Sequence, residues 1–259
     1  MKFRHIFQVL APVAALAVAA TLSGCDGVKM KISDDEGKPL SEIDTSGPAP
    51  TELVLAGPDD VVITHGDKLA IVVGGDPAVA EQMRFTLKNG TLGIMRPGKL
   101  WNRDSSGRVT VKVTMPDPTE LTLAGSGTIK AVSMAREAKI TIAGSGVVET
   151  QALTVEKLEL TVAGSGNYRA GGSAHSLELT IAGSGGAQMD GLKVDEAKVT
   201  IADSGSTSFA SDGSVSASIM GSGSVTVKGR ASCKVSAMGS GELVCEPGDG
   251  KGVADADKK

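Results

Sequence analysis

Residues 140–146 read ITIAGSG, and close copies of this heptapeptide recur along the second half of the chain. The central serines of successive copies are separated by 19, 20, 19, 20, 18 and 18 residues. A unit that repeats at such a period is typical of solenoids, in which each unit buries its apolar face only by stacking on its neighbours. The seven copies are LTLAGSG (121–127), ITIAGSG (140–146), LTVAGSG (160–166), LTIAGSG (179–185), VTIADSG (199–205), ASIMGSG (217–223) and VSAMGSG (235–241).

The residues around each serine alternate between apolar and polar. Numbered from the central serine, positions −7, −5 and −3 are apolar, as in Leu158, Leu160 and Val162, whereas positions −6 and −4 are mostly charged or hydroxylated. After the corner, positions +3 and +5 are again mostly apolar, as in Val225 and Val227. A period of two indicates strands with one buried face. The sequence therefore predicts an all-β fold, a parallel β-helix of about seven coils of about 19 residues, each with two short strands around a Gly-Ser-Gly corner.

Glycine and serine form the corners of the predicted coils. Position +1 is glycine in all seven copies and position −1 in six, with Asp203 as the exception. A sharp corner needs positive φ or close backbone approach, which glycine allows. We expect the serines to be structural and to form hydrogen bonds along the ladder or within the turn, because a nucleophile needs an adjacent base and none recurs near them. These serines are Ser126, Ser145, Ser165, Ser184, Ser204, Ser222 and Ser240.

Three other uses of a repetitive β-surface were compared with the repeats. A calcium ladder needs a carboxylate in each turn, and only Asp203 falls in one. An ice-binding face would need more than the single threonine position, −4, that recurs here. A sugar-cleaving β-helix needs clustered carboxylates with arginine or lysine, and usually aromatic platforms. Tyr168 and Phe209 are the only aromatic residues among the repeats. We therefore expect a non-catalytic role and keep the sugar-cleaving enzyme as the alternative.

Composition restricts the classes of partner. The 259 residues include 34 glycines but only six aromatic residues, so the core must consist of small branched side chains. The 26 basic and 30 acidic residues give a net charge of −4. Because the protein has no excess of basic residues to neutralise phosphates, we do not expect nucleic acid as a partner. We expect no metal site and no cofactor.

The first 25 residues form a predicted targeting segment. A basic start precedes an apolar run at residues 6–20, and Leu22-Ser23-Gly24-Cys25 follows. This order resembles a lipoprotein signal peptide with its lipobox at residues 22–25, in which Cys25 is lipidated and becomes the mature N-terminus. The alternative is an ordinary secretory signal. Residues 26–50 are predicted to be a flexible tether, and residues 248–259 a disordered tail.

Residues 51–118 lack the Gly-Ser-Gly repeat but are rich in strand signals. Strands are expected at Glu52–Ala56, Asp60–His65, Lys68–Val73, Arg84–Leu87, Thr91–Met95 and Arg108–Thr114, with a short helix at Pro77–Met83. Asn89-Gly90 between two of these strands predicts a hairpin turn. Lys99–Gly107 is expected to form a loop that carries Trp101. We interpret the region as a cap over the N-terminal edge of a solenoid at residues 119–247, since an uncovered edge would pair with other chains.

Two cysteines remain if Cys25 carries lipid. Cys233 is at position −7 and Cys245 at position +5 of the last coil, where the preceding coil has the inward residues Val215 and Val227. Strands that face each other across a narrow coil can bring two such cysteines within bridging distance. We predict a disulfide that locks the last coil; the alternative is two buried thiols.

The stretches GDKLAIVVGGDP (66–77), LKNGTLGIMRPG (87–98) and VTVKVTMPDPTELTLAGSGTI (109–129), followed by the AGSG repeats, together resemble the autotransporter adhesin head GIN domain family. These are bacterial envelope domains of unknown function, and the resemblance covers residues 51–246. The family has no assigned catalytic residues, so none is transferred. The chain differs from a secreted autotransporter in its lipobox and in having no long C-terminal barrel region.

The sequence therefore predicts a lipid-anchored protein of the bacterial cell envelope, on the periplasmic side or the outer surface. Its solenoid would be a non-catalytic adhesin or scaffold that contacts an envelope polysaccharide, peptidoglycan or another envelope protein, with the membrane reached through the lipid on Cys25. The alternatives are a polysaccharide-active β-helix enzyme and a purely structural periplasmic protein.

Overall fold

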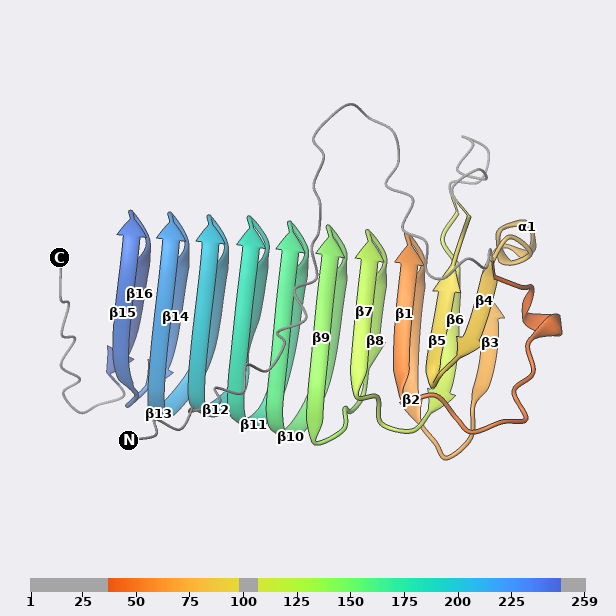
Figure 1. Ribbon diagram of the computed structural model, residues 1–259, viewed down its shortest axis with the longest axis horizontal. Helices are drawn as coiled ribbons and strands as arrows, with labels where there is room; N and C mark the ends of the chain where they lie inside the picture. The colour runs from red at the N-terminus through yellow and green to blue at the C-terminus, as the bar shows by residue number, and fades with distance from the viewer. Residues whose placement is uncertain (1–36, 98–106, 248–259) are drawn as a thin grey trace, which may run out of the picture. The chain divides into compact units, whose positions relative to one another are not determined.

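The strands that carry the repeat pair in parallel with their own copies one coil away. In a computed structural model, which describes residues 37–97 and 107–247, Thr141 lies opposite Thr122 and Thr161 opposite Thr141. Figure 1 shows the strands side by side in chain order from β7 to β15. Those of the first sheet are β7 (Glu120–Gly125), β9 (Glu137–Gly144), β10 (Val147–Gly164), β11 (Asn167–Gly183), β12 (Gly186–Asp203), β13 (Ser206–Gly221) and β15 (Ser232–Gly239).

A second row of strands closes the coils. It consists of β8 (Thr128–Ala131), the first parts of β10 to β13, β14 (Ser224–Gly229) and β16 (Glu242–Pro247), again paired in parallel. The strands β10 to β13 are 16 to 18 residues long because each continues from one corner through a bend to the next. The predicted parallel β-solenoid is therefore confirmed.

Burial follows the predicted alternation. In β10 the side chains of Leu158, Leu160 and Val162 are at most 1% exposed, whereas Thr161 between them is exposed. The same inward positions are buried in every coil from β9 to β13. Each fully buried branched side chain contributes about 1.5–3 kcal/mol, so even a coil that buries few large side chains gains a continuous core from its neighbours.

The corners stack directly on one another. Gly144 has a φ of +128°, and a Cβ atom there would lie 2.5 Å from the carbonyl oxygen of Gly125 in the preceding coil. The same oxygen accepts hydrogen bonds of 3.0 Å from the backbone amides of Ser145 and Gly146. Asp203 takes the glycine position in one coil with a φ of +94°, a conformation that side chains other than glycine adopt at a cost.

The N-terminal region contains more solenoid than the sequence predicts. Strands β1 (Glu52–Gly57) and β2 (Asp60–His65) pair in parallel with β7 and β8, and they form a coil in register with the repeats. Strands β5 (Thr91–Met95) and β6 (Thr110–Met115) form one further coil on the other side of β1 and β2. The chain thus builds its second coil before its first, and then returns to continue from β7.

Antiparallel strands cover the end of this first coil. Strand β4 (Arg84–Lys88) pairs with β5, and β3 (Ala70–Gly74) pairs with β6. The hairpin predicted at Asn89-Gly90 is present, with φ values of 52° and 81° that fit a type I′ turn. The helix α1 (Pro77–Ala80) is shorter than predicted; the Asp76 carboxylate accepts a hydrogen bond from its first turn.

The second part of the predicted tether, residues 37–50, contacts the folded body in the structure. Lys38 and Phe85 form an antiparallel bridge, with backbone hydrogen bonds of 2.9 and 2.7 Å. A short 3-10 helix, η1 (Leu40–Glu42), follows, and Leu40 and Ile43 pack against the core. These two apolar side chains attach the segment to the core. The mostly polar composition of residues 26–50 gave no sign of this contact. The signal segment with Cys25, the first part of the tether, the Trp101 loop and the tail at 248–259 lie outside the described residues.

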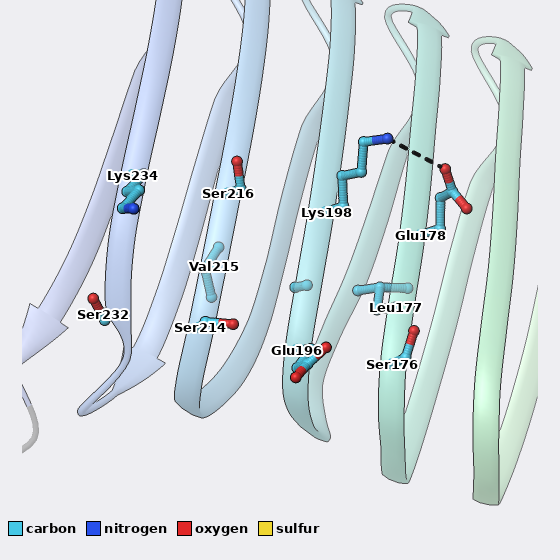
Figure 2. A pocket seen from close by; sticks show the side chains of 11 residues that line it. Ser176, Leu177, Glu178, Glu196, Lys198, Ser214, Val215, Ser216, Ser232 and Lys234 are labelled. Atoms are coloured by element: carbon cyan, nitrogen blue, oxygen red, sulfur yellow. Dashed lines mark ion pairs between the residues drawn. The ribbon is translucent and has the colours of Figure 1, made fainter.

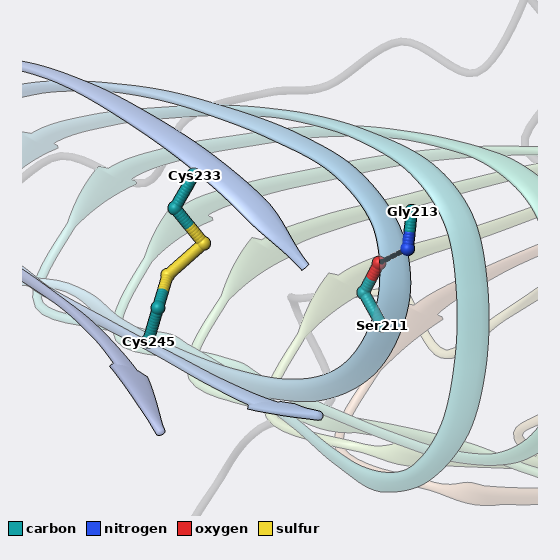
Figure 3. Close-up of a disulfide and its surroundings, with 4 residues drawn as sticks. All are labelled: Ser211, Gly213, Cys233 and Cys245. Atoms are coloured by element: carbon teal, nitrogen blue, oxygen red, sulfur yellow. Dashed lines mark hydrogen bonds between the residues drawn. A yellow bond between two sulfur atoms is a disulfide. The ribbon is translucent and has the colours of Figure 1, made fainter. Parts of the chain in front are cut away.

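A disulfide joins the two strands of the last coil. Cys233 in β15 and Cys245 in β16 are bonded across the coil, with a Cα–Cα distance of 6.7 Å (Figure 3). Their positions one coil earlier, Val215 and Val227, are almost fully buried. The cysteines thus replace an inward aliphatic pair at the coil where fewer neighbours remain.

The corner geometry predicts opposite effects for two substitutions. Gly144→Ala forces a side chain onto the Gly125 carbonyl and is expected to lower the free energy of unfolding by about 1–3 kcal/mol. Asp203→Gly relieves a positive φ and is expected to raise it by about 1 kcal/mol. Urea denaturation measures both. Ser145→Ala, an exposed change beside Gly144, is the control and should lie within about 0.5 kcal/mol of the unmodified protein.

The disulfide predicts the thiol content and the stability of the chain. Titration of denatured, unreduced residues 26–259 should find no reactive thiol, and two after reduction. The Cys233→Ser/Cys245→Ser variant is expected to lose about 2–4 kcal/mol of stability, because the crosslink restricts the unfolded state. Two reactive thiols before reduction would contradict the disulfide.

Candidate functional site

The outward face of the first sheet carries a continuous row of hydroxyl groups. Position −4 points away from the core in each strand, and the parallel register places every member opposite the next. Adjacent members therefore recur at the strand spacing of about 4.8 Å. The row consists of Thr122, Thr141, Thr161, Thr180, Thr200, Ser218 and Ser236, and we call it the threonine row.

Small side chains lie beside the threonine row. Position −2 is alanine from Ala124 to Ala202, and it becomes Met220 and Met238 in the last two strands of the sheet. The seven corner serines follow, all of them exposed, and Ser204 Oγ donates a 3.0 Å hydrogen bond to Asp203. Because no bulky side chain interrupts β7 to β12 at positions −4, −2 and 0, an extended ligand can approach the backbone closely along these coils.

Charged residues border the threonine row on its other side. At position −6, Lys139 pairs with Glu120 at 3.1 Å and Lys198 with Glu178 at 3.7 Å. These groups are substantially exposed, so each pair contributes little to stability. Glu178, Lys198 and Lys234 line a depression of 590 Å³ together with serines of β11, β13 and β15 (Figure 2). The charges can therefore orient a polar ligand.

The second sheet has a different outward face. Glu149 accepts hydrogen bonds from Lys130 and Arg169, both at 3.1 Å, and Lys130 in particular lowers the pKa of its carboxyl. These three residues line a depression of 470 Å³ together with Arg108 and Asp60, which lie 3.5 Å apart. On this face two carboxylates are shared among three cations, and the charged groups form no uniform row.

Both histidines of the described residues are paired with aspartates on the surface. His65 Nδ1 lies 2.9 Å from Asp117, and the Ser133 hydroxyl donates to the same carboxylate oxygen at 2.5 Å. Partial burial opposes these hydrogen bonds, which nevertheless lower the pKa of Asp117. His175 lies 3.0 Å from Asp195, and this hydrogen bond raises the pKa of the imidazole. Since the carboxylate lies between Ser133 and His65, the histidine is not placed to take a proton from the serine.

The aromatic residues of the repeats are internal. Tyr168 and Phe209 are both fully buried. The Tyr168 hydroxyl lies 2.6 Å from that of Thr150, and burial raises the pKa of the phenol. Neither ring is therefore exposed to stack on a sugar.

One internal ion pair was not foreseen in the sequence. Arg96 Nε donates to Asp59 at 3.0 Å, and both side chains are buried. Asp59 also accepts from the backbone amide of Val109 at 3.1 Å. The strand register places Asp59 at the position where the repeats have the +1 glycine. The departure from Gly-Ser-Gly at residues 57–60 was therefore the only sequence signal for this contact.

The structure brings the predicted residues together in two groups. The corner serines form one exposed row, and Cys233 and Cys245 form the disulfide. Cys25 lies outside the described residues. Within residues 37–97 and 107–247, no cluster of three or more His, Cys, Asp or Glu residues is arranged to hold a metal ion. None of the helices in that part of the chain is long and apolar enough to cross a membrane.

Several solved structures share the fold of this chain. A protein of Parabacteroides distasonis described as a "putative lipid binding protein" aligns with a TM-score of 0.60 and 21% identity over 77% of this chain and 93% of that chain. A "putative adhesin" of Bacteroides fragilis gives a TM-score of 0.62 and 18% identity, covering 77% and 92%. Another from Parabacteroides merdae gives 0.62 and 20%, covering 76% and 92%. At these identities the likeness is one of fold.

The family comparison covers most of the described solenoid. No curated protein matches the chain. The family model described as "Putative auto-transporter adhesin, head GIN domain" matches residues 49–231. This range begins just before β1 and ends just before β15. Since this match spans more than half of the sequence, the chain belongs to the auto-transporter adhesin head GIN domain family.

Proposed function

We propose that the protein is a lipid-anchored, non-catalytic adhesin of the bacterial cell envelope that binds an extended glycan along the threonine row. The observation that carries this proposal is the in-register series of hydroxyl groups from Thr122 to Ser236. The family description and two of the solved neighbours name adhesins, which supports a role in binding.

A glycan suits the chemistry of this face. Its hydroxyl groups both donate and accept hydrogen bonds, as do those of threonine and serine. Each exposed hydrogen bond is weak, contributing about 0.5–1.5 kcal/mol. A polymer can form several at once, because after the first contact the others become intramolecular. The bordering lysines and glutamates can add contacts to amide or carboxylate substituents.

The lipid anchor rests on the first 25 residues. A diacylglyceryl group on Cys25 would supply two acyl chains, which is sufficient for stable membrane attachment where one chain is marginal. In the anchored protein, the solenoid would face the aqueous compartment next to that membrane.

The threonine row predicts the effect of a double charge substitution. Thr161→Glu/Thr180→Glu removes two hydroxyl groups of the row and places two anionic side chains on adjacent strands, which repel carboxylate groups of the polymer. It is expected to weaken binding to insoluble peptidoglycan or envelope polysaccharide at least about tenfold, equivalent to about 1.4 kcal/mol. Co-sedimentation of residues 26–259 with the polymer measures this change. The matched control, Gln188→Glu/Ser208→Glu, lies on adjacent strands of the other sheet and should bind normally.

Three outcomes would contradict the proposed glycan binding. These are no binding by the unmodified chain, equal loss in the control variant, and release of new reducing ends from the polymer. The last would favour the polysaccharide-active enzyme instead.

The anchor predicts covalent labelling at a single residue. Cells grown with radiolabelled palmitate should incorporate label into the full chain, which should fractionate with membranes. Cys25→Ser removes the only lipidated thiol and should abolish both. Label retained in the Cys25→Ser variant would contradict lipidation at this cysteine, without affecting the proposal for the threonine row.

A further inference from the structure

The two ends of the ladder differ. At the N-terminal end, antiparallel β3 and β4 cover the first coil, and Lys38 bridges to β4 in turn. At the other end, β15 pairs only with β13 and β16 only with β14 among the described strands. The backbone edges of β15 and β16 are therefore available for pairing, which is the arrangement that recruits a further strand.

The core is also open at this end. Val235, Cys233, Leu243 and Cys245 are partly exposed, whereas the equivalent residues one coil earlier are almost fully buried. Met238 is 71% exposed on the outward face. The last coil thus combines unpaired strand edges with apolar surface, and the disulfide holds its two strands at a fixed separation (Figure 3).

We propose that this end binds a second copy of the chain, so that two solenoids join end to end through their last coils. A two-fold axis parallel to the strands would place β15 of one copy antiparallel to β16 of the other, and the reverse. The symmetry forms two new strand pairs at once and closes both edges.

The disulfide fixes the register of this pairing. Cys233 and Cys245 lie across the coil from each other, and a two-fold axis along the strands preserves their height. Cys233 of one copy then lies beside Cys245 of the other, and Val235 beside Leu243. Inward residues therefore meet inward residues, and the two apolar cores become continuous, as a one-residue slip would not allow.

Charge favours the same arrangement. In this register Lys234 of one copy lies opposite Val244 of the other, with Glu242 and Glu246 as its diagonal neighbours. All three charged residues are outward and exposed, so each new strand pair brings a lysine between two carboxylates. The chain's own tail is a poorer occupant, because residues 248–259 (GDGKGVADADKK) contain Val253 as their only branched aliphatic residue.

Sedimentation velocity of residues 26–259 over a micromolar concentration series tests the proposal. The unmodified chain should dimerise, whereas Lys234→Glu alone and Glu242→Lys/Glu246→Lys alone should each dissociate at least about tenfold more readily, because like charges then face each other. An equimolar mixture of the two variants should recover the dimer, since each lysine again meets carboxylates. A merely misfolded variant would not recover in the mixture.

Control variants separate the last coil from the rest of the chain. Lys198→Glu changes the same position two coils earlier and should leave the dimer intact. A monomer at all concentrations would overturn the proposal, and so would a dimer that forms only after deletion of residues 248–259, since the tail would then cover the edge. A dimer unaffected by all the charge variants would also overturn it. These results are independent of glycan binding.

Discussion

Each corner glycine packs against the carbonyl oxygen of the corner one coil earlier, and the rest of the solenoid depends on this contact. It brings the backbones so close that a Cβ atom at Gly144 would lie within 2.5 Å of the Gly125 oxygen. The same oxygen accepts the amides of the next corner. Because every coil turns at the same height, the strands on both sides of the corner enter the ladder in register, and like residues align along the molecule.

Alignment of like residues gives the chain its two surfaces. Inward, the aliphatic rows make one core that no single coil could form. Outward, they produce the threonine row and the ion pairs beside it, as between Lys139 and Glu120. The contacts that fold the chain therefore also determine the spacing of the groups that a ligand meets.

Local pattern predicted the coils, the buried positions, the Asn89-Gly90 hairpin and the cysteine pair that the structure joins. All of these depend on residues within one coil or on one period of the repeat. The threonine position was also recognisable, but its surroundings required the register of seven strands. The sequence pattern therefore showed the recurring threonines, which were considered only as an ice-binding face, but it did not identify the candidate site that they form.

Long-range order was less accessible. Nothing in the strand pattern of residues 51–118 shows that β1 and β2 lie between β5–β6 and β7–β8, because the order of coils is decided by edges that meet only in the folded chain. Lys38 and Ile43 were assigned to a tether, since their partners, the backbone of β4 and the core, are remote in sequence. Asp59 and Arg96 likewise meet only after two coils have stacked.

Because each coil contacts only its two neighbours, the number of coils can change without changing the side chains that the outward face presents to a ligand. A duplicated coil inserted between β11 and β12 would meet the same corner above and below, and its threonine would extend the row by one strand spacing of about 4.8 Å. Neither end of the ladder would change. Gene duplication within the repeat could thus lengthen the protein in fixed steps, so that the reach of the molecule can evolve separately from what its face binds.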